Sequence, residues 1–218
     1  MTFYHRHGAC YWKKRAHPEF PGTMAQMEAQ TIHLRDLQAW RDLSPAVQEI
    51  WNTYALSVQS HRPPFKADHH ITGHNLFVSA YHGFAQLGEE HVPTPCPFES
   101  FPVFWVEFSG VEVVDSENLL LKLHVILGGT EDPQRYRLMT RLQLTSPGRG
   151  RQPGYLRSHI AIDNCSDNDC IVSVHVPDYK NIWDLDLQEY QVHMRNLLID
   201  TETGYRCNFK KKSFLLLI

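Results

Sequence analysis

Long hydrophobic runs are absent from this sequence of 218 residues. The longest apolar run, Phe214–Ile218, has five residues, whereas a helix that spans a membrane needs about 18 or more. No apolar segment of signal-peptide length follows the first methionine. The sequence therefore predicts a protein that is synthesised in the cytoplasm without a signal peptide and has no membrane span.

An excess of positive charge is absent as well, because 21 lysines and arginines face 24 aspartates and glutamates, for a net charge of -3. General nucleic-acid-binding proteins are usually clearly basic, so this balance argues against that class. Two dense basic runs, Lys13–Arg15 and Lys210–Lys212, are each short enough to be the solvated end of a strand.

The signatures of common enzyme classes are missing too. The sequence contains no G-x-S-x-G, no H-E-x-x-H and no Walker-type G-x-x-x-x-G-K motif. Cys10 lies near His5 and His7, but the rim of a hairpin is a poor place to desolvate a thiol–imidazole pair. We therefore expect a protein without enzymatic activity and without a cofactor.

Cysteine is sparse, and the five cysteines are an odd number scattered along the chain. This usage is typical of free thiols in a reducing compartment. Cys165 and Cys170 flank four polar residues, and in a tight loop they could form a disulfide in an oxidised particle. A plain hairpin loop with Asx turns is the favoured interpretation. A calcium loop is the least favoured, because the D-x-[DN]-x-[DN]-G register is missing.

Helical periodicity marks the first part of the chain. Apolar residues recur every three or four positions in 23–40, 44–58 and 74–87, which predicts three amphipathic helices. Ser44 is a suitable N-cap, and Pro45 stands at the first helical position, where its missing N–H is not needed. We expect the first two helices to pack as a hairpin. The aromatic stretch FYHRHGACYW before them predicts a small β-hairpin.

The pattern changes after a segment rich in proline. Residues 92–102 contain four prolines, which favour extended backbone and predict a semi-rigid linker. Short extended runs separated by turn signals follow it, at 103–108, 118–127, 136–144, 155–162, 170–176, 189–199 and 204–218. About seven strands at this spacing are typical of an immunoglobulin-like sandwich. Alternation in the first of them predicts a buried Trp105.

The predicted fold class is therefore α+β. Residues 1–91 would form a β-hairpin and a three-helix docking module, and 92–102 would form the proline-rich linker. Residues 103–218 would form an antiparallel, immunoglobulin-like β-sandwich.

The stretch HHITGHNLF at 69–77 is a weak candidate for a metal site, through His69, His70 and His74. On one helix His70 and His74 would share a face and could bind zinc. Gly73 interrupts the helix that this geometry needs, and Thr72 or Asn75 could cap a helix instead. The sequence favours a helix start, and no metal is expected.

Trp183 is the best candidate for an exposed aromatic residue, because its neighbours are polar and it lies between two predicted strands. Together with Tyr179 it could stack on a glycan or contact another subunit. The capped edge of a core would explain Trp183 equally well.

Residues 1–95 resemble a set of uncharacterised bacterial and prophage-encoded proteins. The segments that carry the resemblance are YHRHGACYWKKR, PGTMAQ, AWRDLSPAVQEIWNTYA and TGHNLFVSAYHGFAQLG. The matching positions include Trp40, Ser44, Trp51, Asn52, Tyr54, Gly73, Asn75 and Phe77. In that set a β-sandwich commonly follows. The resemblance covers under half of the chain, and it implies a structural component of a phage or phage-like particle with no catalytic residue.

Taken together, these patterns predict a non-enzymatic assembly protein that acts through contacts with other protein subunits, in a homo-oligomer. Residues 1–15 and 204–218 are expected near subunit boundaries, because both segments look like sheet edges. The alternative is a sandwich that binds a carbohydrate or receptor, with a surface glycan as partner. A histidine-dependent metal hydrolase comes third.

Overall fold

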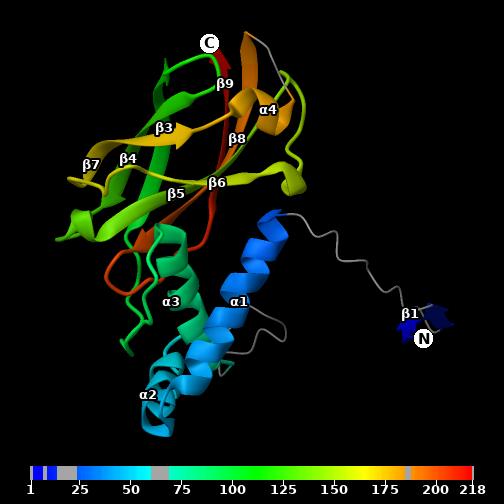
Figure 1. Ribbon diagram of the computed structural model, residues 1–218, viewed down its shortest axis with the longest axis vertical. Helices are drawn as coiled ribbons and strands as arrows, with labels where there is room; N and C mark the ends of the chain where they lie inside the picture. Colours follow the sequence, from blue (N-terminus) through cyan, green and yellow to red (C-terminus); the bar gives the residue numbers. More distant parts are fainter. Residues whose placement is uncertain (1, 7–8, 14–23, 60–68, 185–187, 218) are drawn as a thin grey trace. The chain divides into compact units, whose positions relative to one another are not determined.

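The computed structural model describes residues 2–6, 9–13, 24–59, 69–184 and 188–217 (Figure 1). The chain divides into two compact units, Met1–Arg35 and Asp36–Ile218. Helices and antiparallel sheets are both present, so the predicted α+β class is confirmed. No helix in the described part of the chain is long and apolar enough to cross a membrane.

The first unit contains a β-hairpin and the beginning of a helix. β1 (Thr2–Arg6) pairs antiparallel with β2 (Ala9–Lys13). Helix α1 (Met24–Asp42) begins in this unit and ends in the second. The predicted hairpin and first helix are both confirmed.

In the second unit, α2 (Pro45–Ala55) begins where the sequence places an N-cap. The backbone N–H of Val47 donates to Ser44 Oγ at 3.4 Å, which satisfies one of the amide groups that the first turn of a helix leaves free. Only two residues separate α1 from α2. Helix α2 packs mainly against helix α3 (Gly73–Leu87), so the predicted packing of the first two helices as a hairpin is not confirmed.

Helix α3 (Gly73–Leu87) is bounded by two local signals. At its start the backbone N–H of Asn75 donates to Thr72 Oγ1 at 3.2 Å. At its end Gly88 has a φ of 82°, in the left-handed region that glycine adopts without strain. The interpretation of HHITGHNLF as a helix start is confirmed.

The helices of the second unit share an aromatic core. Trp51 and Phe77 are fully buried, with their rings edge to face at 5.6 Å, and the ring of Trp40 lies 5.4 Å from that of Phe77. Asp36 Oδ2 lies 2.7 Å from His82 Nε2, which links the end of α1 to α3.

Seven antiparallel strands of the second unit form two sheets, whose inner faces contribute to one core. The first sheet has the order β3-β4-β7, with β3 at Val103–Val113, β4 at Leu119–Gly128 and β7 at Asp169–Val176. The second has the order β6-β5-β8-β9, with β6 at Arg157–Ile160, β5 at Tyr136–Thr145, β8 at Glu189–Asp200 and β9 at Lys210–Leu217. Short helices connect strands at η1 (Pro133–Arg135), η2 (Pro153–Tyr155) and α4 (Tyr179–Trp183).

The two sheets meet differently along their two sides. On one side an isolated bridge pairs Ala161, just after β6, with Val174 of β7. On the other side β3 and β9 have no backbone pairing with each other over the described residues, and they meet only through side chains. The rings of Phe108 and Phe214 stack there at 4.5 Å. We call this the open side, because side chains and no backbone hydrogen bonds connect β3 and β9 over the described residues.

Two glycines bring α3 into backbone contact with the turn that follows β8. A Cβ on Gly83 would lie 1.7 Å from the carbonyl oxygen of Gly204, so no side chain fits between helix and turn. Gly204 also has a φ of 71°. Helix α3 and the second sheet therefore belong to one packed body.

The proline-rich segment 92–102 makes two kinds of contact with the rest of the second unit. Phe98 and Phe101 pack against the aromatic core of the helices. The hydroxyl of Tyr205 donates to the carbonyl oxygen of Cys96 at 2.7 Å. The domain boundaries at 91/92 and 102/103 stay predictions, but the segment between them contacts both the helices and the chain after β8.

Some sequence-based expectations are wrong. Trp105 is 54% exposed, because Phe104 and Val106 are the inward residues of β3. The last strand begins at Lys210 rather than near residue 204, because the chain between β8 and β9 packs against α3 instead.

We expect Trp51→Ala to lower the free energy of unfolding by about 3–5 kcal/mol, because a fully buried indole leaves a large cavity. Urea unfolding followed by circular dichroism would measure the loss. Ile50→Ala, one residue earlier and 44% exposed, is the matched control and should change stability much less. Equal losses in the two variants would contradict the helical packing.

Candidate functional site

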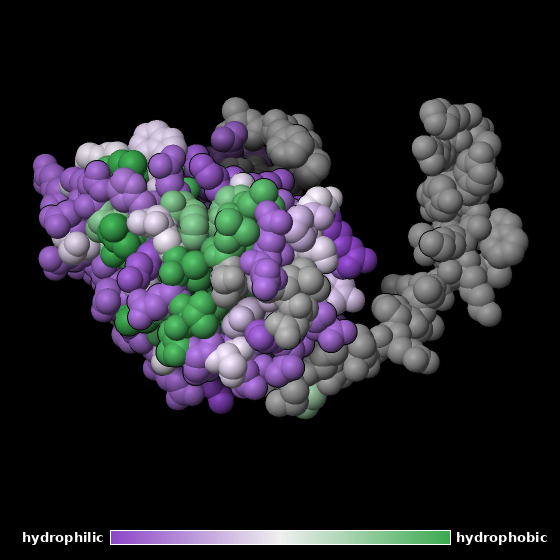
Figure 2. Space-filling view, turned by 90° about the horizontal axis from the view of Figure 1, so that it is seen from above, coloured by the Kyte–Doolittle hydropathy of each residue, from purple (hydrophilic) through white to green (hydrophobic). Residues whose placement is uncertain are grey.

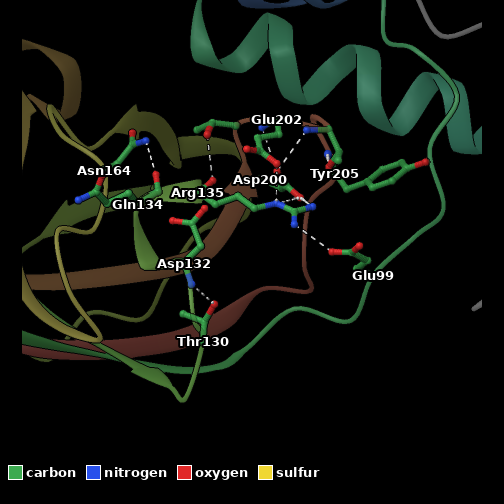
Figure 3. Close-up of polar contacts among 11 residues, drawn as sticks. Glu99, Thr130, Asp132, Gln134, Arg135, Asn164, Asp200, Glu202 and Tyr205 are labelled. Atoms are coloured by element: carbon green, nitrogen blue, oxygen red, sulfur yellow. Dashed lines mark hydrogen bonds and ion pairs between the residues drawn. The ribbon is translucent and has the colours of Figure 1, made fainter.

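A cluster of polar side chains surrounds Arg135, the last residue of η1, directly before β5 (Figure 3). Its Nε and Nη2 atoms donate to Asp200 Oδ2 at 2.9 and 2.6 Å, and Nη1 donates to Glu99 at 2.9 Å. Asp200 is buried, and its other oxygen accepts from the backbone N–H groups of Glu202 and Thr203. The hydrogen bond with Asp200 is the main cause that raises the pKa of Arg135.

The Arg135 cluster holds chain segments together rather than forming a site for a ligand. It connects the proline-rich segment, β5 and the end of β8, and its positive charge is compensated by carboxylates. Sequence reasoning missed it, because its members are far apart in the chain and carry no common motif.

The three candidate metal ligands do not come together. His74 lies on α3 with its ring edge to face against Trp40 at 5.4 Å, whereas His70 is exposed and pairs by a backbone bridge with Gln59. Among the residues that the structure describes, no group of three side chains suited to one ion contains His69, His70 or His74. These three histidines therefore give the hydrolase hypothesis no geometric support.

Cys165 and Cys170 are free thiols, and both are buried. Burial, followed by the neighbouring Cys170, raises the pKa of Cys165 strongly. The two thiols are close enough for each to affect the other. A disulfide between them under oxidising conditions stays a prediction.

Of the two interpretations of Trp183, the structure favours the capped edge of a core, because α4 turns its side chain and that of Tyr179 inward. Tyr179 meets Tyr190 edge to face at 6.0 Å, and Trp183 is 8% exposed and donates from Nε1 to the carbonyl oxygen of Tyr155 at 2.9 Å. An edge of Trp183 lines a cavity of about 380 Å³ with Arg149 and other polar residues.

The outer edges of the two sheets are the largest exposed feature with a clear physical meaning. β3 and β9 are edge strands, and edge strands present unpaired backbone N–H and C=O groups. They run in the same direction, because Lys210 lies 6.0 Å from the ring of Phe104 while Phe214 stacks on Phe108.

The final residues of these two strands therefore bring apolar side chains to the same end of the open side. We use the name apolar edge patch for four exposed apolar residues at or next to the ends of these strands: Val113 (49% exposed), Val114 (55%), Leu215 (53%) and Leu217 (72%). Figure 2 shows the molecule from the top of the view in Figure 1, and on this face hydrophobic residues gather among hydrophilic ones. Sequence reasoning indicated the β9 half of this region.

No protein-family model matches the chain, and no curated protein matches it in sequence.

We expect Arg135→Gln to destabilise the protein by about 3–5 kcal/mol, because the buried carboxylate of Asp200 would lose its cation. Chemical unfolding at neutral pH would measure the change. Lys122→Gln is the control, since Lys122 pairs with Glu112 at 3.1 Å where both side chains are exposed. Such a pair contributes about 1 kcal/mol or less. Similar losses in both variants would contradict the assigned role.

The pKa of His159 is lowered by burial to about 4, from 6.5. The unfolded chain binds a proton first as the pH falls through this range, so His159 should reduce stability progressively between pH 6.5 and 4, by about 2–3 kcal/mol in all. Unfolding of wild type and His159→Gln at pH 7.5 and at pH 5 would test this. The variant should lose less stability than wild type on acidification, and an equal loss in both proteins would contradict the assignment.

Proposed function

We propose that the chain is a non-enzymatic subunit that assembles with further copies of itself through the open side between β3 and β9. The observation that carries the proposal is that two edge strands, β3 and β9, end close to the exposed side chains of the apolar edge patch. A second strand added to either edge would satisfy backbone groups and cover these side chains at the same time.

The assembly proposal includes two finer statements. One is that the two-sheet body is an immunoglobulin-like β-sandwich, which seven antiparallel strands in two packed sheets support. The other is that the assembly is a phage or phage-like particle, such as a virion. The support for it is the resemblance carried by Trp40, Trp51 and Phe77, which the structure uses as core residues.

A carbohydrate-binding module is the second candidate, supported by the cavity beside Trp183. Its lining offers neutral and charged hydrogen-bonding groups, among them Gln143, Arg149, Gln152 and Asp184. Sugars are bound by such groups next to an aromatic ring. Only the edge of the indole faces this cavity, because Trp183 is largely buried, so assembly is the better supported function.

We expect the purified chain to sediment as an oligomer at micromolar concentration. The double variant Leu215→Lys, Leu217→Lys should sediment as a smaller species, because charge on an edge opposes strand addition. Leu56→Lys, at a position 62% exposed in the turn after α2, is the matched control and should leave the oligomer intact.

Analytical ultracentrifugation over a dilution series would decide between the outcomes. A monodisperse monomer for wild type, or dissociation by Leu56→Lys to the same extent, would contradict assembly through the β3 and β9 edges. Deletion of residues 1–15 tests the other predicted boundary separately.

A further inference from the structure

A group of arginines lies on the outer face of the second sheet without acidic neighbours. Arg141 on β5 stands directly opposite Arg195 on β8 in the strand register, so both side chains project from the same face. Like charges placed opposite each other destabilise a sheet. Both guanidinium groups lie over the ring of Phe209, at 5.6 Å for Arg141 and 4.5 Å for Arg195.

A third guanidinium group, that of Arg206, approaches the same place from the segment between β8 and β9. Arg141 and Arg206 line one cavity of about 280 Å³, between α3 and the sheet. The neutral polar residues in its wall are Ser79, Gln86 and Asn208, and no carboxylate is part of it. We call this cavity the arginine pocket.

The positive charge around the arginine pocket has no counter-charge in the described part of the chain. No ion pair there involves Arg141, Arg195 or Arg206, in contrast to Arg135, which pairs with the carboxylates of Glu99, Asp200 and Glu202. Arg206 donates only to the neutral Gln86, at 3.3 Å, and Arg141 to Ser158, at 3.1 Å. The buried Nε of Arg195 has no hydrogen-bond partner.

Electrostatics shows the same imbalance. Burial lowers the pKa of Arg206 and that of Arg141, and in each case a neighbouring arginine lowers it further. A partly desolvated guanidinium group without a counter-ion is unfavourable, whereas one that binds an anion through two N–H groups is strongly stabilised.

Stacking on Phe209 gives a structural role to Arg195 and, at a longer distance, to Arg141, but not to Arg206. Arg195 can cover the apolar ring of Phe209 with its guanidinium plane. Arg206 lacks such a stacking partner among the described residues, and it sits beside Arg141 although their charges repel. Two guanidinium groups that converge on one cavity are suited to an oxyanion that accepts several hydrogen bonds.

We propose that the arginine pocket binds a phosphate group, with Arg141 and Arg206 as its charged donors and Ser79, Gln86 and Asn208 as neutral donors. The phosphate dianion offers enough acceptor oxygens for both guanidinium forks, and it would compensate the charge that the fold leaves unpaired. The site is independent of the β3 and β9 edges, so it does not rest on the assembly function.

The phosphate can be free or part of an ester, and an adjoining cavity distinguishes the two. This second cavity, of about 420 Å³, shares Ser79, Arg206, Cys207 and Asn208 with the arginine pocket. The rings of Phe98, Phe101 and Tyr205 also line it. An aromatic group attached to a bound phosphate could enter it, whereas free phosphate would not use it.

Isothermal titration of the full chain with inorganic phosphate and with phenyl phosphate, at constant ionic strength, tests the proposal. We expect saturable binding of at least one probe and a rise in melting temperature with its concentration. Tighter binding of phenyl phosphate would assign the site to a phosphate ester, and tighter binding of inorganic phosphate to the free ion. Absence of binding by both at millimolar concentration would overturn the proposal.

Charge-neutral variants locate the site. Arg206→Gln should weaken binding at least about tenfold, because it removes a charged hydrogen-bond donor. Without phosphate this variant should melt at or above the wild-type temperature, since it also removes repulsion with Arg141. Arg41→Gln, which removes the same charge from the exposed end of α1, is the control.

An unchanged affinity in Arg206→Gln, or an equal loss in Arg41→Gln, would place the bound phosphate elsewhere and overturn the assignment. Arg141→Gln serves the same purpose if Arg206→Gln does not fold, and its affinity should fall to a similar extent.

Discussion

The buried carboxylate of Asp200 is the contact on which most of the second unit depends. One of its oxygens accepts hydrogen bonds from the Arg135 guanidinium group, and the other accepts them from the backbone N–H groups of Glu202 and Thr203. These bonds shape the turn that places Gly204 against α3 and Tyr205 in the helical core. A single buried charge therefore joins the helices, the proline-rich segment and the second sheet, and its burial is tolerated because its acceptors are satisfied.

The arginines of this protein fall into two groups, one with a structural role and one with a candidate functional role. Arg135 faces carboxylates and contributes to stability, whereas Arg141 and Arg206 face a cavity and each other. Two cations that repel each other do not stabilise the fold by lying close together. A bound anion would explain why Arg141 and Arg206 share one cavity. On the open side, the edge strands β3 and β9 likewise present backbone N–H and C=O groups without a partner strand. A strand from a further subunit would form hydrogen bonds with these groups.

Local patterns were sufficient to predict most elements of the fold. The caps at Ser44 and Thr72, the apolar stripe through Trp51 and the glycine after α3 act within a few residues of one another, so their effect is readable from sequence. Alternation also located all seven later strands. It did not predict correctly on which face of β3 the side chain of Trp105 lies, because a shift of one residue moves every side chain of a strand to the other face.

The sequence by itself therefore determined helices α1 to α3 and the approximate positions of the strands, because hydrophobic period and capping are short-range properties, but it missed α4 and the start of β9. Only the tertiary structure decided that Trp183 is buried and that His70 and His74 are separated. Only the tertiary structure shows that Arg141 and Arg206, which are 65 residues apart in the sequence, line one cavity. Strand register and the contact between Gly83 and Gly204 set these positions, and both depend on the packing of distant segments, which no local spacing encodes.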